Sequence, residues 1–158
     1  MEDKKVIKIG LMGVGTVGTG VIKVLLKNQE VIAHRIGADL EIKRVLDKDI
    51  ERVSAKIKEL GLNESILTSD VNELIGDPEI DIIVEVIGGI HPALEYIIKA
   101  LEKGKSVVTA NKDLIAAHGK ELFEAASHHQ TDLFFEASVA GGIPIIQSMK
   151  ESLAGNQI

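Results

Sequence analysis

The sequence has no cysteine, no long apolar run and no excess of basic residues. Without cysteine, this chain cannot form a disulfide, a thiolate metal site or a catalytic thiol. No apolar run approaches the roughly 20 residues that span a bilayer, so we expect no membrane association. The net charge of −6 disfavours nucleic acid as the main partner, because phosphate backbones are bound by basic surfaces. The opening residues, MEDKKVIKIGLMG, pass from charge into a short strand without a secretory signal, so we expect a cytoplasmic protein.

The chain does contain enough hydrophobic sequence for a core. Hydrophobic residues make up 45% of its 158 residues, and no repeat, low-complexity segment or internal linker interrupts them. This length suits one domain of ordinary size, so we predict a single domain over residues 1–158.

Short apolar runs alternate along the chain with longer amphipathic stretches. Such alternation predicts an α/β fold, with a mostly parallel sheet and helices on both faces. Residues 29–39 form an added loop or an extension of the first helix. The predicted strands are 6–12, 40–47, 81–88, 106–110 and 132–138, and the predicted helices are 16–28, 49–60, 69–76, 91–104, 120–130 and 143–155.

The first predicted strand runs into GVGTVG, a G-x-G-x-x-G frame formed by Gly13, Gly15 and Gly18. Gly13 permits a tight turn, Gly15 lets a pyrophosphate approach the backbone, and Gly18 lets the next helix lie close to the strand. The helix begins near Thr16 and Val17, so its free N–H groups and its partial positive charge, about half a unit, would face the phosphates. The frame follows a strand and opens a helix, which is the context of a dinucleotide-binding turn in a Rossmann-type, doubly wound sheet. The alternative is a glycine-rich turn that binds no ligand.

The second predicted strand ends at Asp47, whose carboxylate could accept hydrogen bonds from the adenosine ribose and repel a 2′-phosphate. The added segment places it further from the glycines than the usual spacing of about 20 residues. Arg44 and Lys48 flank it and could attract a phosphate instead. All three charges could also form only a solvated strand end. The sequence leans toward NAD and leaves NADP open.

Another strand end is expected at the same edge of the sheet, because ligands of a doubly wound sheet bind beyond the carboxyl ends of its strands. Ile87, Gly88 and Gly89 follow the third predicted strand. The two glycines would let the backbone approach a flat ring, so we predict that this turn contacts the nicotinamide.

The stretch TANKDL follows the fourth predicted strand and places Thr109, Asn111 and Lys112 at this edge as well. Asn111 and Lys112 would point across the crevice. An ammonium beside a nicotinamide can bind a substrate carboxylate or hydroxyl, and it can move protons if burial lowers its pKa from about 10.4. An isolated lysine more often caps a carbonyl or lies in solvent, but the position at a strand end favours a catalytic Lys112.

Four motifs, GLMGVGTVG, EVIGG, VVTANKDLIA and EASVAGGIP, together resemble the N-terminal half of a homoserine dehydrogenase across essentially the whole chain. The resemblance implies interconversion of L-homoserine and L-aspartate 4-semialdehyde with NAD or NADP, in threonine, methionine and isoleucine biosynthesis. It also implies that Lys112, the lysine of the family's ANK motif, contacts cofactor and substrate. The segment with Glu136, Val139, Gly141 and Ile143 resembles a monovalent-cation site, often for Na⁺, built largely from backbone carbonyls. A glycine-rich approach to a helix would look the same.

The chain ends at LAGNQI, where members of that family continue into a second domain. In the family, that domain carries most homoserine-binding groups, a second catalytic lysine and much of the contact of a homodimer. We therefore expect this chain to be the cofactor-binding part of such an enzyme, which binds the cofactor weakly and turns over homoserine hardly at all.

Other functions stay open from the sequence alone. Related sugar and amino-acid dehydrogenases carry Glu-Lys-Pro at the same strand end, where this chain has ANKDL. Thioester-forming aldehyde dehydrogenases need a cysteine nucleophile. A module that senses NAD(H) without chemistry would need no lysine at the nicotinamide end. Glu85, inside the third predicted strand, has no partner that the sequence identifies, and adjacent His128 and His129 fit a solvated helix end better than a metal site.

Overall fold

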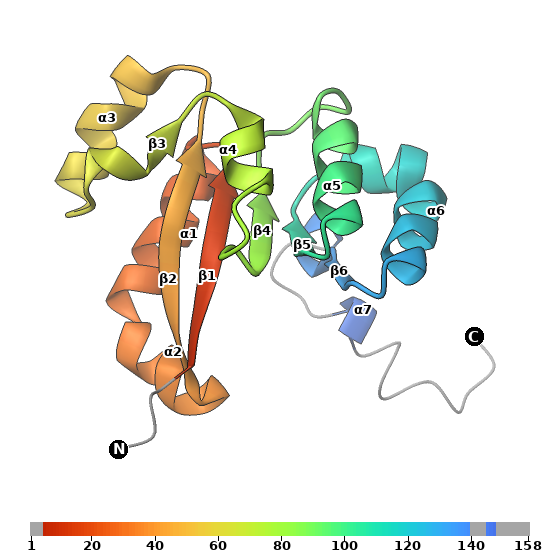
Figure 1. Ribbon diagram of the computed structural model, residues 1–158, viewed down its shortest axis with the longest axis horizontal. Helices are drawn as coiled ribbons and strands as arrows, with labels where there is room; N and C mark the ends of the chain where they lie inside the picture. The colour runs from red at the N-terminus through yellow and green to blue at the C-terminus, as the bar shows by residue number, and fades with distance from the viewer. Residues whose placement is uncertain (1–4, 140–144, 148–158) are drawn as a thin grey trace.

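The computed structural model describes residues 5–139 and 145–147. Six parallel strands form one sheet within these residues (Figure 1). They are β1 (Lys5–Met12), β2 (Ala38–Leu46), β3 (Leu67–Thr68), β4 (Ile82–Glu85), β5 (Ser106–Thr109) and β6 (Leu133–Phe134). The spatial order is β3-β2-β1-β4-β5-β6, so the direction of chain progress reverses between β1 and β4. Ligands of such sheets bind beyond the carboxyl ends of the strands at this reversal.

Helices connect the strands. The α-helices of the described residues are α1 (Thr16–Lys27), α2 (Gln29–Ile36), α3 (Ile50–Glu59), α4 (Val71–Ile75), α5 (Ala93–Glu102), α6 (Lys112–His128) and α7 (Ile145–Gln147), and the 3₁₀-helices are η1 (Glu64–Ile66) and η2 (Glu136–Ser138).

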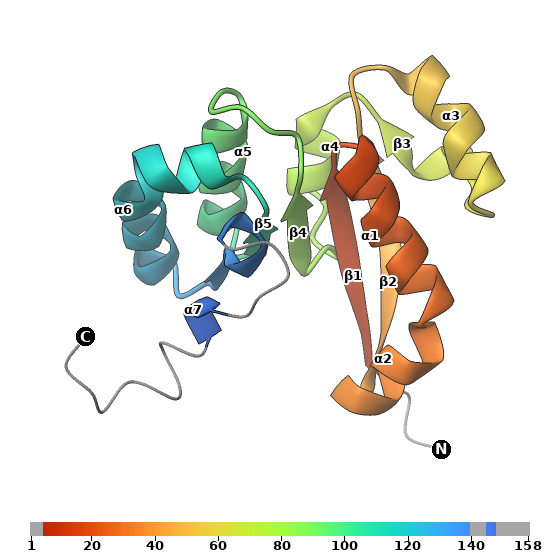
Figure 2. The same cartoon turned by 180° about the vertical axis from the view of Figure 1, so that it is seen from behind.

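Alternate side chains of the strands pack into two cores, one on each face of the sheet. On β1, Leu11 belongs to one core and Met12 to the other, as the two-residue period of a strand requires. The smaller core lies under α1 and α3, and the larger core lies under α4, α5 and α6. Figures 1 and 2, seen from opposite sides, show α1 in front of the sheet in one view and α5 in front of it in the other.

The predicted Rossmann-type α/β fold is confirmed, and so are helices at the predicted places after β1, β2, β4 and β5. The open alternative for residues 29–39 is decided in favour of a helix, because α2 occupies most of that segment and ends at Gly37, whose φ is 70°. The two-residue strand β3 was not predicted, because two residues are too short for a periodic signal.

One helix prediction is wrong at its start. The helix predicted over 120–130 already begins at Lys112, because the Asn111 side chain caps it and accepts a hydrogen bond from the Leu114 amide at 3.2 Å. Lys112 is therefore the first residue of a helix and not part of a loop. Of the helix predicted over 143–155, only residues 145–147 are described.

Two strand predictions are too long. The strand predicted over 81–88 ends at Glu85, because Gly88 and Gly89 turn the chain with positive φ values of 79° and 74°. The strand predicted over 132–138 ends at Phe134, and η2 follows it. Glu136 thus lies in a 3₁₀-helix and not in the sheet.

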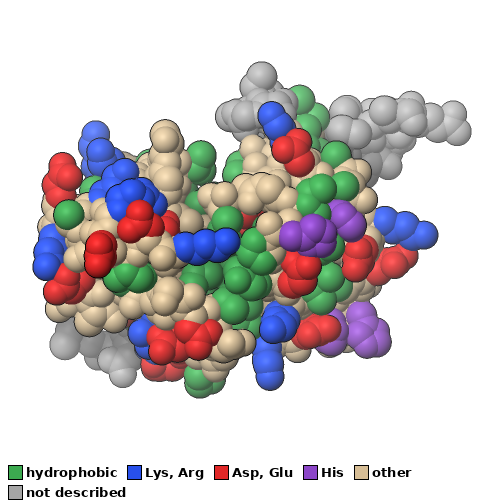
Figure 3. Space-filling model, turned by 90° about the horizontal axis from the view of Figure 1, so that it is seen from above, with side chains coloured by type: hydrophobic (Ala, Val, Ile, Leu, Met, Phe, Trp, Pro, Cys, Tyr) green, Lys and Arg blue, Asp and Glu red, His purple; other side chains and the backbone are tan. Residues whose placement is uncertain are grey.

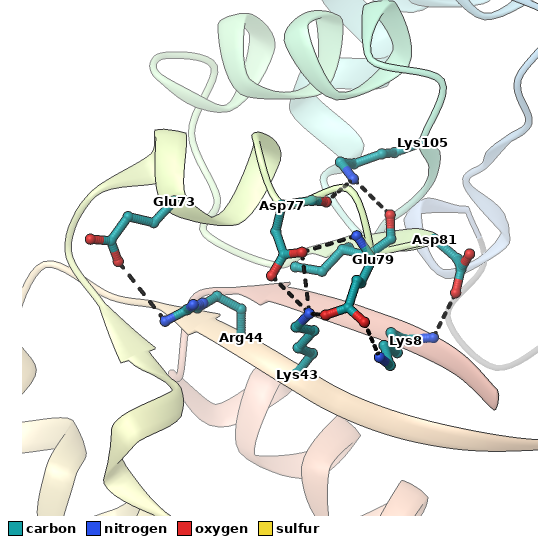
Figure 4. A network of polar contacts seen from close by, with 9 residues as sticks. Lys8, Lys43, Arg44, Glu73, Asp77, Glu79, Asp81 and Lys105 are labelled. Carbon is teal, nitrogen blue, oxygen red and sulfur yellow. Dashed lines mark hydrogen bonds and ion pairs between the residues drawn. The ribbon is translucent and has the colours of Figure 1, made fainter.

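A network of charged side chains surrounds the connection between α4 and β4, at the amino ends of β4 and β5 (Figure 4). Glu79, in the connection between α4 and β4, pairs with Lys8 of β1 at 2.7 Å and with Lys43 of β2. Lys105, only 4% exposed, donates hydrogen bonds to the carbonyls of Asp77 and Ile80 at 2.5 and 2.7 Å. These contacts fix the connection that carries the chain across the sheet from β3 to β4.

None of the helices in residues 5–139 and 145–147 has the length and apolar character that crossing a membrane would require.

Candidate functional site

The turn after β1 depends on two glycines, because the backbone geometry at both positions disfavours any side chain. Gly13 has a φ of 98°, and its amide donates a hydrogen bond of 2.8 Å to the Leu46 carbonyl at the end of β2. A Cβ atom on Gly18 would lie 2.0 Å from the Gly13 carbonyl oxygen. The predicted roles of these glycines, a tight turn and a close approach of helix to strand, are therefore visible in the geometry.

Gly15 differs, because the protein leaves the space beside it open. Apart from Gly15 itself and its chain neighbours, no atom of the described residues lies within 4 Å of the position that a Cβ on Gly15 would take. Gly15 is the N-cap of α1, without a capping side chain and without an acidic residue in the first turn. Thr16 and Val17 follow on the exposed face of that turn. An uncapped helix start with free space before it has the geometry that binds an anionic group such as a pyrophosphate.

Asp47 lies beside this turn and holds it. Its Oδ2 atom accepts a hydrogen bond of 2.9 Å from the Val14 amide, and its Oδ1 atom accepts one of 3.1 Å from the Asp49 amide. An Nη2 atom of Arg52 lies 3.4 Å from Oδ1. The carboxylate is thus already engaged with the glycine turn, and a ribose hydroxyl would have to share it.

A pocket of about 340 Å³ joins these groups to the segment that follows β4. Its walls include the glycine turn, the end of β2, the first turn of α3 and the segment after β4. Arg44 does not line it, since that side chain turns toward Glu73 instead. The lining residues are Gly13, Val14, Gly15, Leu46, Asp47, Lys48, Arg52, Ser69, Val86, Ile87 and Tyr96.

A broader depression of about 760 Å³ lies on the outer surface of α6, lined by residues between Lys120 and His128. It is a nearly flat surface formed by one helix and contains none of the glycine-turn residues. We therefore place the site at the smaller pocket.

Buried polar groups connect the turns after β4 and β5. Glu85, fully buried at the end of β4, accepts hydrogen bonds from the amides of Ile87 and Gly88 at 2.8 and 3.3 Å. Its other oxygen accepts a hydrogen bond of 2.6 Å from the Thr109 hydroxyl. The structure therefore supplies the partners of Glu85 that the sequence did not identify, and they belong to the turns of the candidate site.

Asn111 extends this connection. Its side-chain amide donates a hydrogen bond of 2.6 Å to the Gly89 carbonyl, while its Oδ1 atom caps α6. Asn111 is only 7% exposed, so its side chain joins two turns and does not extend freely across the crevice. Thr109 is fully buried as well.

Lys112 is exposed at the first position of α6. Its ammonium makes no hydrogen bond or ion pair with any of the described residues. The ammonium is therefore not engaged by this part of the chain and is accessible to a ligand.

Two histidines lie near the same edge. The rings of His91 and His118 pack edge to face with centroids 6.4 Å apart, and His91 Nδ1 lies 2.6 Å from a Glu95 oxygen. Hydrogen bonds from its own backbone amide and from His91 lower the pKa of Glu95. No group of three potential metal ligands occurs among the described residues.

The residues predicted for a cation are described only in part. Gly141 and Ile143 lie outside the described residues. Glu136 accepts a hydrogen bond of 3.0 Å from the Ile146 amide, and Val139 follows η2. The carboxylate of Glu136 is therefore occupied at least partly by the start of α7.

The structure brings the predicted cofactor-binding residues to one edge of the sheet. Viewed onto this edge, hydrophobic side chains gather in the middle of the face, charges of both signs lie on both sides of them, and histidines lie on one side (Figure 3). Sequence reasoning missed Glu85, Arg52, Ser69 and Tyr96 as neighbours of the site. The sequence could have indicated Arg52. It lies three residues after Asp49, the N-cap of α3, and this position directs its side chain back toward the end of β2.

The chain is similar to known proteins along almost its whole length. The family model for the homoserine dehydrogenase NAD-binding domain matches residues 13–136. The homoserine dehydrogenase of Bacillus subtilis is 45% identical over 154 residues, which are 98% of this chain and 35% of that protein. That of Corynebacterium glutamicum is 47% identical over 150 residues, which are 95% of this chain and 33% of that protein. The chain thus spans about a third of the length of these curated relatives.

Solved structures agree with the sequence relatives. A homoserine dehydrogenase from Thiobacillus denitrificans superimposes with a TM-score of 0.89 at 42% identity, covering 99% of this chain and 36% of that one. A hyperthermophilic archaeal homoserine dehydrogenase in complex with NADPH gives a TM-score of 0.76 at 26% identity, covering 95% of this chain and 50% of that one.

Proposed function

This chain belongs to the family of homoserine dehydrogenase NAD-binding domains, and from this membership we propose that it binds the nicotinamide cofactor of an oxidoreductase that interconverts L-homoserine and L-aspartate 4-semialdehyde. The observation that carries the proposal is the start of α1. There, an uncapped helix end and the open space beside Gly15 meet a pocket bordered by Asp47.

Each part of the crevice has a defined task in this proposal. The amides at the start of α1 bind the pyrophosphate, because the helix end carries partial positive charge and unpaired donors. The turn with Gly88 and Gly89 lies against the nicotinamide ring. When bound, the cofactor accepts or supplies the hydride.

Lys112 faces the substrate. The positive charge of its ammonium and the partial positive charge of the N-terminal end of α6 lie at one point. Together they favour binding of the carboxylate of homoserine. The same ammonium can hold or return a proton at the substrate hydroxyl. A module that only senses NAD(H) would not depend on this side chain.

We also propose that the pocket accepts NADP(H) through Arg52 and Lys48. Both side chains line the pocket beside Asp47, and both are exposed enough to reach a 2′-phosphate. Asp47 is drawn toward the Val14 amide, which reduces its repulsion of that phosphate. One relative of the same fold is described in complex with NADPH.

Several finer statements stay predictions. They include Na⁺ binding by the segment with Glu136, Val139, Gly141 and Ile143, dimerisation of the whole enzyme, a role in threonine, methionine and isoleucine biosynthesis, and a cytoplasmic location. We also predict that this chain alone turns over homoserine hardly at all. A sodium titration of cofactor binding and a kinetic assay would test two of them directly.

The proposed binding is tested by titrating the chain into NADPH and NADH and following nicotinamide fluorescence. We expect saturable binding that Gly15→Val weakens at least tenfold, since an isopropyl group would fill the space for the pyrophosphate. Gly20→Val is the matched control, because that glycine is exposed on α1, does not line the pocket and has no positive φ. Wild-type protein that binds neither cofactor would refute the proposed function.

A further inference from the structure

Glu85 is a buried carboxylate at a position of the sheet where the surrounding core would favour an apolar side chain. In register it lies between Met12 on β1 and Thr109 on β5. Met12 is fully buried in the larger core, and so is Ile83, two residues earlier on β4. Burying a carboxylate is unfavourable unless hydrogen bonds satisfy it, so an acidic residue here needs a reason beyond packing.

The hydrogen bonds of Glu85 all lead to the turns of the cofactor crevice. Oε1 accepts from the amides of Ile87 and Gly88, at the start of the turn proposed to face the nicotinamide. Oε2 accepts from the Thr109 hydroxyl, on the neighbouring strand. The Glu85 side chain therefore holds in position both the backbone after β4 and the Thr109 side chain at the end of β5.

The connection continues from Thr109 to the start of α6. The Thr109 hydroxyl, having donated its hydrogen to Glu85, accepts a hydrogen bond of 3.0 Å from the Asn111 amide. Asn111 then donates to the Gly89 carbonyl and caps α6. The chain of bonds thus returns to the glycine turn where it began and includes the residue immediately before Lys112.

We propose that Glu85 is a positioning residue for the nicotinamide end of the crevice, acting through Thr109 and Asn111 to hold the Gly88–Gly89 turn and the start of α6 in one arrangement. The inference rests on the proposed function, since it concerns how that same crevice is held. Glu85 itself is buried and touches neither cofactor nor substrate. The hydrogen bonds of its side chain end on the nicotinamide side, and none of those among the described residues is made to the glycine turn after β1.

The test is Glu85→Gln, measured against two ligands. A glutamine can accept from the backbone amides only by turning its NH₂ group toward Thr109, so the bond between the two side chains must reverse and the buried Thr109 hydroxyl loses the acceptor for its own hydrogen. One ligand is NADPH, and the other is 2′-phospho-ADP-ribose, which lacks only the nicotinamide ring. We expect the dissociation constant for NADPH to rise about tenfold and that for 2′-phospho-ADP-ribose to stay within about twofold, because only one end of the crevice is disturbed.

Two further variants keep the test decisive if Glu85→Gln does not fold. Thr109→Val removes the hydroxyl and keeps the shape, and we expect the same selective loss of NADPH binding. Thr109→Ser keeps the hydroxyl, and we expect it to restore binding. Glu102→Gln, on the exposed last turn of α5, is the matched control for loss of a carboxylate.

The outcomes separate the inference from the proposed function. Equal weakening of both ligands in Glu85→Gln or Thr109→Val would mean a general structural role and would overturn the inference. Unchanged NADPH binding in folded Glu85→Gln would overturn it as well. Wild-type protein that binds neither ligand would refute the proposed function and the inference with it.

Discussion

The carboxylate of Asp47 accepts a hydrogen bond of 2.9 Å from the backbone amide of Val14, 33 residues earlier in the chain. This bond joins the end of β2 to the turn after β1, across the floor of the pocket. The same carboxylate would border the adenosine ribose of a bound cofactor. One residue therefore supports the fold of the glycine turn and shapes the place where the ligand lies.

Replacing Asp47 should affect both stability and binding. In Asp47→Ala, the amides of Val14 and Asp49 lose a charged acceptor, and we expect the free energy of unfolding to fall by about 1.5–3 kcal/mol. Denaturant unfolding measures this, and NADPH titration should show weaker binding as well. Asp39→Ala, at the far end of β2, is the control for binding, and an equal loss of NADPH affinity there would contradict the role of Asp47.

Two glycines of α1 should respond in opposite ways to alanine. A Cβ on Gly18 would lie 2.0 Å from the Gly13 carbonyl oxygen, so Gly18→Ala must push α1 away from β1. We expect a loss of about 1–3 kcal/mol in stability together with weakened cofactor binding. Gly20→Ala meets no atom within 4 Å and lies in a helix interior, so it should stabilise by about 0.4–1 kcal/mol. Thermal unfolding of both variants checks the contrast, and a destabilised Gly20→Ala would contradict it.

Arg52 should separate the two cofactors. Its side chain is 53% exposed and lines the pocket, where the guanidinium could pair with a 2′-phosphate. We expect Arg52→Ala to weaken NADPH binding about 10-fold or more and to leave NADH binding nearly unchanged, because only NADPH carries that phosphate. Arg35→Ala, on exposed α2, controls for the general loss of a positive charge. Equal losses for both cofactors would show that Arg52 contributes only through its ion pairs with Asp47 and Asp49.

Lys112 should matter for chemistry and not for folding. Its side chain is exposed and unpaired among the described residues, so Lys112→Ala should shift the free energy of unfolding by no more than about 0.5 kcal/mol. Under the proposed function, we expect homoserine oxidation by a protein that joins this chain to a substrate-binding domain to slow by about 10²-fold or more, the usual loss for a proton-transfer group. Lys120→Ala, on the same helix, is the control. Wild-type kinetics in Lys112→Ala would rule out the catalytic assignment.

Lys105 should make stability depend on pH at the opposite edge of the sheet. Burial lowers its pKa below the ordinary 10.5, and the nearby carboxylates of Asp77 and Asp81 offset only part of that effect. Between the lowered pKa and 10.5, the unfolded chain binds a proton that the folded chain has released, so the free energy of unfolding contributed by this group rises with pH. At pH values below the lowered pKa, Lys105 is charged in the folded protein, and the full free-energy cost of burying that charge reduces the stability.

The measurement is urea unfolding over a series of pH values for wild type and Lys105→Met. We expect the wild type to gain stability relative to the variant as pH rises toward 10.5. At neutral pH the variant should still lose about 1–3 kcal/mol, because the carbonyls of Asp77 and Ile80 lose their donor. Lys99→Met, on the exposed side of α5, should show neither effect.

The fold and the cofactor end of the site were accessible from sequence because their signals are local. The period of apolar residues predicts strands and helices, and three glycines at fixed spacing after a strand predict the turn that binds phosphates. Asn111 shows the limit of local signals. It caps α6, but the sequence analysis interpreted TANKDL through its lysine and therefore predicted the helix start too late.

The sequence by itself determined the α/β class, the glycine turn and the set of polar residues that follow the strands, because each depends on residues close together in the chain. Only the tertiary structure decided which of those residues are available to a ligand. It turned Asp47 toward Val14, joined Glu85, Thr109 and Asn111 into one buried chain of hydrogen bonds, and left Lys112 exposed at a helix start. The physical reason is that a buried polar group must find a partner, and strand pairing brings those partners together from distant parts of the sequence.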